Sequence, residues 1–263
     1  MRKSITIKEL KEIQLNILEN VDKYCEVNGL QYFLAYGTLI GAIRHKGYIP
    51  WDDDIDIYMP RPDYDIFITE YNKTNSLYKV IDKSIDANYT IAFAKVHDTR
   101  TQINETMYQK EDFGVYIDIF PLDGIENNEK AIKITRLRHY LNTKRAILGR
   151  SRTFSKNIFL VFGKICLLPF STKYILDKME RIAREINYEE AKYVNSFFSS
   201  TAYKETVPKS LFDDYTLVKF EHLTCRIPKQ YDKLLRINYG DYMQLPPIEQ
   251  RVTHHNFEAW WKE

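Results

Sequence analysis

The stretch W-D-D-D-I-D-I-Y-M-P, Trp51–Pro60, crowds four carboxylates against an apolar run. All four aspartates fall within five residues. Side chains alternate between the two faces of a strand. A strand over Asp53–Met59 would therefore turn Asp54 and Asp56 to one face and send the neighbouring isoleucines into the core. The stretch predicts a buried strand that carries an acidic cluster on its other face.

The repulsion between Asp54 and Asp56 needs a compensating interaction. Two unit charges about 4 Å apart repel by about 1 kcal/mol in water and about 4 kcal/mol at a sheltered site. A divalent cation held by carboxylate oxygens offsets that repulsion. The alternative is an acidic edge strand whose charges simply face water. The surrounding sequence favours the cation.

Two other motifs point to the same chemistry. Gly37 and Thr38 form a G-T pair at a predicted strand-to-helix turn, where backbone can approach a phosphate closely. Asp118 lies between two isoleucines in V-Y-I-D-I-F-P, so it too should face away from the core. Three carboxylates that hold Mg²⁺, or Mn²⁺ in its place, would suit phosphoryl transfer.

The composition narrows the class of protein. The chain has 263 residues, 44% of them apolar, and a net charge of only +2, so no global field marks a nucleic-acid binder. Its three cysteines are far apart, as expected for reduced thiols in a cytoplasmic protein. The start of the chain lacks the apolar core of a signal peptide. The longest apolar stretch, Asn157–Phe170, is interrupted by Lys164 and is too short to span a bilayer.

The periodicity predicts an α/β (α+β) fold with two sections. Thr6 and Glu9 form a capping box for a helix that Gly29 can end. Five strands are expected in the first section, residues 1–125: Leu30–Tyr36, Asp53–Met59, Leu77–Ile81, Tyr89–Val96 and Val115–Phe120. The second section, residues 126–263, should be mostly helical, with helical patterns up to Asn195 and a hairpin that pairs Thr216–Phe220 with Leu223–Ile227.

Three long motifs resemble the signature of the LicD family. They are F-L-A-Y-G-T-L-I-G-A-I-R-H-K-G-Y-I-P-W-D-D-D-I-D-I-Y-M-P (Phe33–Pro60), Y-I-D-I-F-P-L-D (Tyr116–Asp123) and Y-G-D-Y-M-Q-L-P-P (Tyr239–Pro247). The resemblance implies a nucleotidyltransferase fold, related to fukutin-related proteins. It also implies transfer of phosphocholine from CDP-choline to a sugar hydroxyl of lipopolysaccharide or teichoic acid. Relatives transfer ribitol phosphate or glycerol phosphate from other CDP-alcohols.

The resemblance also assigns residues to the site. The G-[ST] turn of that fold corresponds to Gly37 and Thr38, and its D-x-D corresponds to Asp54 and Asp56. The third carboxylate corresponds to Asp118, and Asp123, which lies in the same motif, is the alternative.

Several cations lie near these motifs. Arg44, His45 and Lys46 follow the Gly-Thr turn and could hold donor phosphates, or form a solvated helix end. Lys95, in the alternating segment I-A-F-A-K-V, is expected to contact phosphate, with a snorkelling edge lysine as the alternative.

A choline head group would need aromatic faces around its cationic nitrogen. Tyr36, Trp51 and Tyr116 lie in the motifs and are candidates, although core packing explains each of them equally well. His254 and His255 near the end of the chain have no assigned role.

A basic segment suggests contact with a membrane. From Lys130 to Tyr174 the chain has no acidic residue. The segment suits either a helix on an anionic membrane, where a lipid-linked acceptor would lie, or a helix buried in the fold. It lacks the regular aromatics of single-strand binders, so we expect no nucleic-acid partner.

Together with the resemblance, the sequence predicts a Mg²⁺-dependent phosphocholine transferase that is either free in the cytoplasm or peripheral at the inner face of the membrane. The alternatives are transfer of ribitol or glycerol phosphate, nucleotidyl transfer, and a metal-dependent carbohydrate-binding protein without catalysis.

Overall fold

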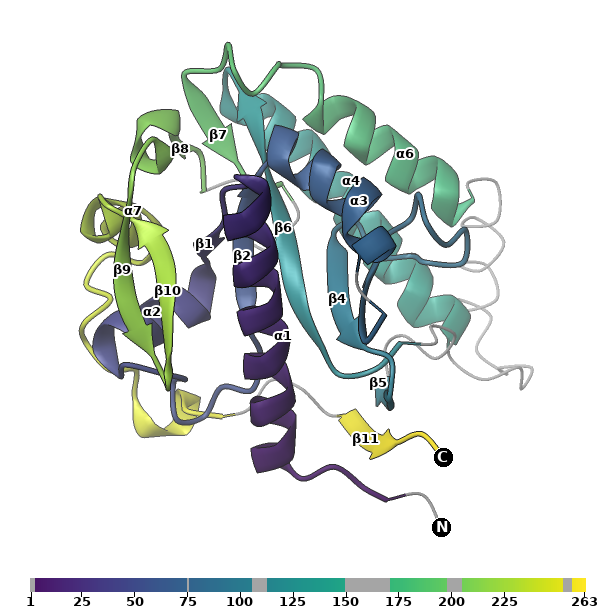
Figure 1. The fold of residues 1–263 in the computed structure, drawn as a ribbon. Coiled ribbons are helices and arrows are strands. Elements are labelled where there is room, and N and C mark those ends of the chain that lie inside the picture. Colours follow the sequence, from purple (N-terminus) through teal and green to yellow (C-terminus); the bar gives the residue numbers. More distant parts are fainter. Residues whose placement is uncertain (1–2, 75, 106–112, 150–170, 198–204, 253–256) are drawn as a thin grey trace.

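A curled mixed sheet forms the centre of the molecule (Figure 1). The computed structural model describes residues 3–74, 76–105, 113–149, 171–197, 205–252 and 257–263. The sheet has seven strands in the order β1-β2-β6-β4-β3, with β7 paired to β6 and β8 to β7. Its strands are β1 (Phe33–Leu34), β2 (Asp56–Pro60), β3 (Tyr78–Ile81), β4 (Ala94–Asp98), β6 (Tyr116–Ile125), β7 (Tyr193–Asn195) and β8 (Val207–Pro208). The pair β2–β6 is parallel and the others are antiparallel.

Helix α1 (Ile7–Asn28) lies across the sheet and contacts β4 and β6 (Figure 1). It begins at the expected capping box, in which Thr6 Oγ1 accepts from the Glu9 backbone N–H and the Glu9 carboxylate accepts from that of Thr6. It ends at Gly29, whose φ of 67° is in the left-handed region that glycine tolerates. Both predicted ends of this helix are confirmed.

The remaining helices surround the sheet. They are α2 (Tyr36–Arg44), α3 (Arg61–Thr74), α4 (Asn128–Gly149), α6 (Thr172–Ala183) and α7 (Tyr231–Tyr239), with short 3-10 turns η2 (Lys209–Phe212) and η3 (Ile248–Gln250). Helix α3 packs beside α1 through edge-to-face contacts of Tyr24 with Phe67 and Tyr71. Helix α4 packs against α6.

Two smaller sheets complete the fold. The predicted hairpin is confirmed as β9 (Tyr215–Phe220) paired with β10 (Leu223–Pro228), and it contacts β1 and α2. Strand β11 (Phe257–Trp261) pairs with β5 (Thr101–Glu105). A bridge between Ser4 and Trp260 brings the two ends of the chain side by side (Figure 1).

The mixed α+β class is confirmed, but several boundaries differ from the prediction. The strand expected from Leu30 is reduced to β1, and the one expected from Tyr89 forms only at Ala94. The helical pattern expected up to Asn195 ends at Ala183, and β7 follows. The second section thus supplies strands as well as helices. The division of the chain at residue 125 stays a prediction.

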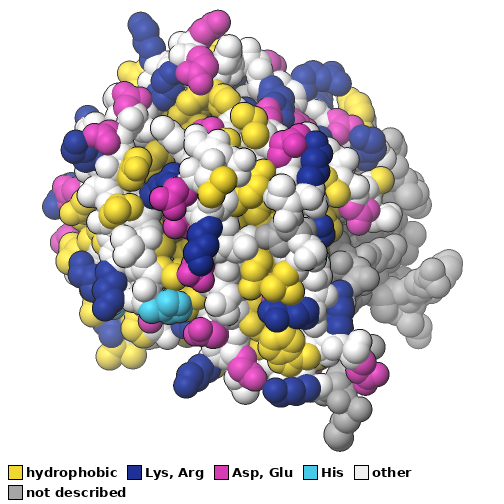
Figure 2. Space-filling model, viewed as in Figure 1, with side chains coloured by type: hydrophobic (Ala, Val, Ile, Leu, Met, Phe, Trp, Pro, Cys, Tyr) yellow, Lys and Arg dark blue, Asp and Glu magenta, His cyan; other side chains and the backbone are white. Residues whose placement is uncertain are grey.

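Neither the described helices nor the face shown in Figure 2 has a feature typical of a membrane-spanning or nucleic-acid-binding protein. No helix in the described ranges is long and apolar enough to cross a membrane. On the face shown in Figure 2, basic and acidic side chains are interspersed. The apolar stretch Asn157–Phe170 lies outside the described residues.

Candidate active site

Asp56 and Asp118 are direct neighbours on two parallel strands. Asp56 begins β2 and is the register partner of Asp118 on β6. Their sequence neighbours Ile55, Ile57 and Ile117 are fully buried, so the two aspartates face away from that part of the core as predicted. The parallel register therefore brings together carboxylates that are 62 positions apart in the sequence.

Asp54 reaches this pair from a loop and not from the strand. Strand β2 starts at Asp56, so the expected strand over Asp53–Met59 is shorter and alternation does not place Asp54. Burial raises the pKa of Asp56 well above its ordinary value, and the charges of Asp54, Asp118 and Asp52 raise it further, while Lys95 opposes them. The negative charges of three neighbouring carboxylates thus repel that of Asp56 at this edge of β2.

The Gly37–Thr38 pair lies in the first turn of α2, beside the carboxylates. Thr38 Oγ1 accepts a hydrogen bond of 2.9 Å from the backbone N–H of Asp56, which ties α2 to β2. A Cβ on Gly37 would lie 2.7 Å from Asp52 Oδ2, so only glycine allows this approach. The helix begins earlier than predicted, at Tyr36, whose φ of 43° is unusual for a residue other than glycine.

Lys95 is buried beside Asp118. Its Nζ lies 2.5 Å from Asp118 Oδ1 and 3.4 Å from the centre of the Tyr116 ring, and only 2% of the residue is exposed. A phosphate contact was expected here. In the structure the ammonium group holds a carboxylate of the cluster and the face of an aromatic ring.

Asp123, the alternative third carboxylate, is bound elsewhere. Its two oxygens accept from Nε and Nη2 of Arg61, each at 2.6 Å, and the residue is 1% exposed. The structure therefore places Asp118 beside Asp56 and gives Asp123 to a buried ion pair.

Arg44, His45 and Trp51 form a second cluster at the end of α2. Arg44 donates to the carbonyl of Tyr242 at 2.8 Å and to His45 Nε2 at 2.9 Å. Arg251 lies over the Trp51 ring, 5.4 Å from its centre. Burial lowers the pKa of Arg44, and the nearby positive charge of Arg251 lowers it further. Two guanidinium groups, those of Arg44 and Arg251, therefore lie near the Trp51 ring and His45, an arrangement that suits an anionic ligand.

Lys46 is exposed and takes a left-handed backbone conformation. Its φ is 62°, and its carbonyl accepts from the backbone N–H of Glu221. His254 and His255 lie outside the described residues.

Three further residues approach the carboxylates and were not among the residues predicted from the sequence. Gln14 of α1 is buried and donates to the carbonyls of Asp53 (3.0 Å) and Tyr116 (3.3 Å), so it fixes the acidic loop against β6. A glutamine within the apolar stripe of α1 was its only signal. Glu205 and Tyr239 also approach the site, although they lie more than 140 positions downstream of Asp56. Tyr239 opens the motif Tyr239–Pro247, whereas Glu205 belongs to none of the motifs.

The donor set suits Mg²⁺, although it is not assembled into a cation site. Carboxylate oxygens are the ligands that this ion prefers, and its charge would relieve the repulsion at Asp56. Within the described parts of the chain, no three His, Cys, Asp or Glu side chains are grouped so that they could hold a metal ion. Asp54, Asp56 and Asp118 are therefore neighbours that a cation would have to draw together.

Comparison with known proteins gives the family. Residues 29–152 match the family model described as LicD/FKTN/FKRP, nucleotidyltransferase domain. The chain is 34% identical over 273 aligned positions to the lipopolysaccharide cholinephosphotransferase LicD of Haemophilus influenzae, with 98% of this chain and 99% of that protein covered. A shorter match of 56 residues, 39% identical, joins it to an uncharacterised protein of Rickettsia typhi and covers 21% of this chain and 18% of that one. Because the first match extends over nearly the whole of both proteins, this chain belongs to the LicD family.

Proposed function

We propose that this protein transfers phosphocholine from CDP-choline to a sugar hydroxyl on a cell-surface glycan or its lipid-linked precursor. The register pairing of Asp56 with Asp118, next to Asp54, carries the proposal on the structural side. The full-length similarity to a protein named as a lipopolysaccharide cholinephosphotransferase supports the choice of group and acceptor.

In this proposal Asp54, Asp56 and Asp118 hold Mg²⁺ or Mn²⁺. The bound ion would neutralise the donor phosphate oxygens. Lys95 fixes the orientation of the Asp118 carboxylate through their ion pair. Arg44 and Arg251 supply positive charge for the nucleotide phosphate, beside His45 and Trp51.

The reaction balances without a further reactant. The sugar hydroxyl oxygen attacks the phosphorus atom that carries choline, and a new O–P bond forms. The bond from that phosphorus to the bridging oxygen breaks, and CMP leaves with the bond electrons. The hydroxyl proton passes to a carboxylate of the cluster, for which Asp118 is the candidate, and from there to solvent.

The acceptor places the protein at a membrane surface. A lipid-linked glycan lies at the bilayer, and the acid-free segment from Lys130 supplies basic residues that anionic lipids attract. We propose peripheral contact with the inner face of the membrane.

Product analysis tests the function. Purified protein, Mg²⁺ and a lipopolysaccharide or teichoic acid preparation are incubated with CDP-choline, CDP-ribitol or CDP-glycerol in parallel. The proposal expects CMP and phosphocholine-modified glycan from CDP-choline, and none from the Asp56→Asn variant. Faster CMP release from CDP-ribitol or CDP-glycerol would assign a different alcohol phosphate. Pyrophosphate release from CTP would indicate nucleotidyl transfer, and glycan binding without turnover would indicate a binding protein.

A further inference from the structure

Aromatic rings gather where α2 begins, next to the carboxylates. Tyr36 lies at the first position of α2 and is partly exposed. Its ring centre is 4.9 Å from that of Tyr58 and 5.0 Å from that of Phe120, both in edge-on contacts. Since Tyr58 and Phe120 are on β2 and β6, two residues after Asp56 and Asp118, this aromatic group lies directly along the strands from the candidate site.

A buried carboxylate lies against this aromatic group. Glu205 is only 7% exposed and comes from the second section of the chain, just before β8. Tyr36 Oη donates to Glu205 Oε2 at 3.3 Å. A negative charge is thus placed among rings, where the local dielectric is low and its attraction for a cation is strong.

Tyr239 links this carboxylate to the candidate site. It is the last residue of α7 and is 43% exposed. Burial of its hydroxyl end raises its pKa, and the charges of Glu205, Asp56 and Asp52 raise it further. Tyr239 thus interacts electrostatically with Glu205 and with the acidic cluster, and part of the residue is exposed.

We propose that Glu205 and the rings of Tyr36 and Tyr239 form a subsite for a quaternary ammonium group, namely the choline end of the donor. A trimethylammonium group has no N–H to donate, so it is recognised by aromatic faces and a nearby carboxylate. A neutral polyol such as ribitol or glycerol would leave hydroxyl groups unpaired against the same rings. The inference rests on the proposed function and assigns its specificity to these three residues.

The other aromatic candidates already carry cations of the protein. Lys95 occupies the face of Tyr116, at 3.4 Å from the ring centre. Arg251 lies over Trp51, at 5.4 Å. Glu205 instead places a carboxylate against the Tyr36 ring, and this is the charge that suits an added cation.

The test compares affinities for CDP-choline, CDP-glycerol and CMP by calorimetry, with Mg²⁺ present. Wild type should bind CDP-choline more tightly than CDP-glycerol. Tyr239→Leu should weaken CDP-choline binding by about 2- to 30-fold, the range of a single cation–π contact, with a smaller change for CDP-glycerol. Glu205→Gln should also weaken CDP-choline binding more than CDP-glycerol binding, because it removes the negative charge that attracts the cation. Tyr239→Phe, which keeps the ring, should retain the preference. Retained CMP binding checks that each variant is folded.

A matched control uses Tyr174→Leu on α6, where the tyrosine is 50% exposed and lies outside this cluster. This variant should bind all three ligands as wild type does. If wild type prefers CDP-choline and neither Glu205→Gln nor Tyr239→Leu reduces the preference, the subsite is wrong while the proposed function stands. If wild type shows no preference for CDP-choline, the result contradicts the proposed transfer of phosphocholine itself, and with it the subsite.

Discussion

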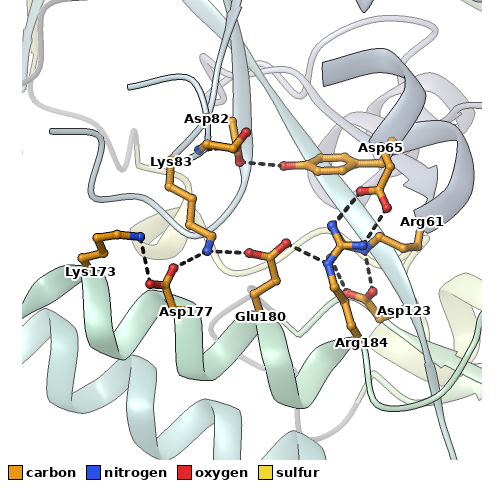
Figure 3. Close-up of polar contacts among 11 residues, drawn as sticks. Arg61, Asp65, Asp82, Lys83, Asp123, Lys173, Asp177, Glu180 and Arg184 are labelled. Carbon is orange, nitrogen blue, oxygen red and sulfur yellow. Dashed lines mark hydrogen bonds and ion pairs between the residues drawn. The ribbon is translucent and has the colours of Figure 1, made fainter. Parts of the chain in front are cut away.

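Arg61 of α3 and Asp123 of β6 form a buried bidentate ion pair, with both hydrogen bonds at 2.6 Å (Figure 3). The pair fixes α3 to the strand that carries Asp118, five residues before Asp123. It explains why an aspartate recurs in I-D-I-F-P-L-D, and it separates a structural carboxylate from a candidate catalytic one.

Asp123→Ala and Asp118→Ala should therefore fail in different ways. Asp123→Ala leaves Arg61 buried without its partner, which should cost about 3–5 kcal/mol of unfolding free energy. Asp118→Ala should cut kcat far more than it weakens donor binding. Denaturant unfolding and steady-state kinetics measure the two effects. An Asp123→Ala protein of normal stability with greatly reduced kcat would reverse the assignment.

Removing the Asp56 charge should abolish turnover and stabilise the metal-free protein. Its pKa is raised in the folded state, mainly by burial, so the folded state binds a proton more tightly than the unfolded chain. Stability is then lost as pH rises above the unfolded value near 4 and through the folded pKa. In thermal unfolding without metal, the stability of Asp56→Asn should therefore exceed that of wild type by more at pH 8 than at pH 4.

The matched control for this prediction is Asp86→Asn, at a partly exposed loop position away from the carboxylate cluster, which should leave activity unchanged and should not reproduce the gain at pH 8. Near-normal turnover of Asp56→Asn at saturating Mg²⁺ would remove Asp56 from the catalytic group.

Lys95 and Asp118 should be energetically coupled. Lys95→Met leaves the Asp118 carboxylate without its 2.5 Å partner and should cost about 1–3 kcal/mol of stability. In the double variant with Asp118→Asn the charge that needed compensation is gone. The double variant should therefore lose less unfolding free energy than the two single variants lose together. A double-mutant cycle in urea measures this coupling, and strict additivity would contradict it.

The ion-pair network that joins α6 to the loop after β3 should weaken in acid (Figure 3). Lys83 Nζ lies 2.8 Å from Asp177 and 2.5 Å from Glu180. A hydrogen bond from Lys83 lowers the pKa of Asp177, and at Glu180 burial opposes but does not overcome the lowering by Lys83 and Arg184. Both groups stabilise the fold above the unfolded pKa near 4 and lose this as pH falls through their folded values.

Lys83→Met should consequently be less stable than wild type at pH 7, and the difference should shrink below pH 4. Thermal unfolding at a series of pH values gives the comparison. A difference that stays constant down to pH 2 would show that the lysine acts through packing alone.

Helix α4 should contribute to binding of anionic membranes. Lys133 and Arg136 are exposed on it, within the segment that has no acidic residue. The Lys133→Glu/Arg136→Glu variant should bind anionic vesicles more weakly than wild type, and salt should release both. Lys219→Glu on β9 is the control, because it also reverses a positive charge but lies outside the acid-free segment; it should bind the vesicles as wild type does. Equal binding of wild type to neutral and anionic vesicles would refute the electrostatic contribution.

Local sequence determined the features that depend on near neighbours. The Thr6–Glu9 box and Gly29 set the ends of α1, because capping needs only backbone groups within one turn. Alternation around Asp118 predicted which side faces the core, and the hairpin β9–β10 was visible in its own residues. The family motifs, being contiguous, could be recognised without coordinates.

The tertiary structure alone decided which distant residues meet. It aligned Asp56 with Asp118, gave Asp123 to Arg61, and turned Lys95 onto a carboxylate. It also brought Glu205 and Tyr239 beside Tyr36, from parts of the chain with no motif in common. Strand register and helix packing are settled by burial summed over the whole core, so no short window of sequence contains them.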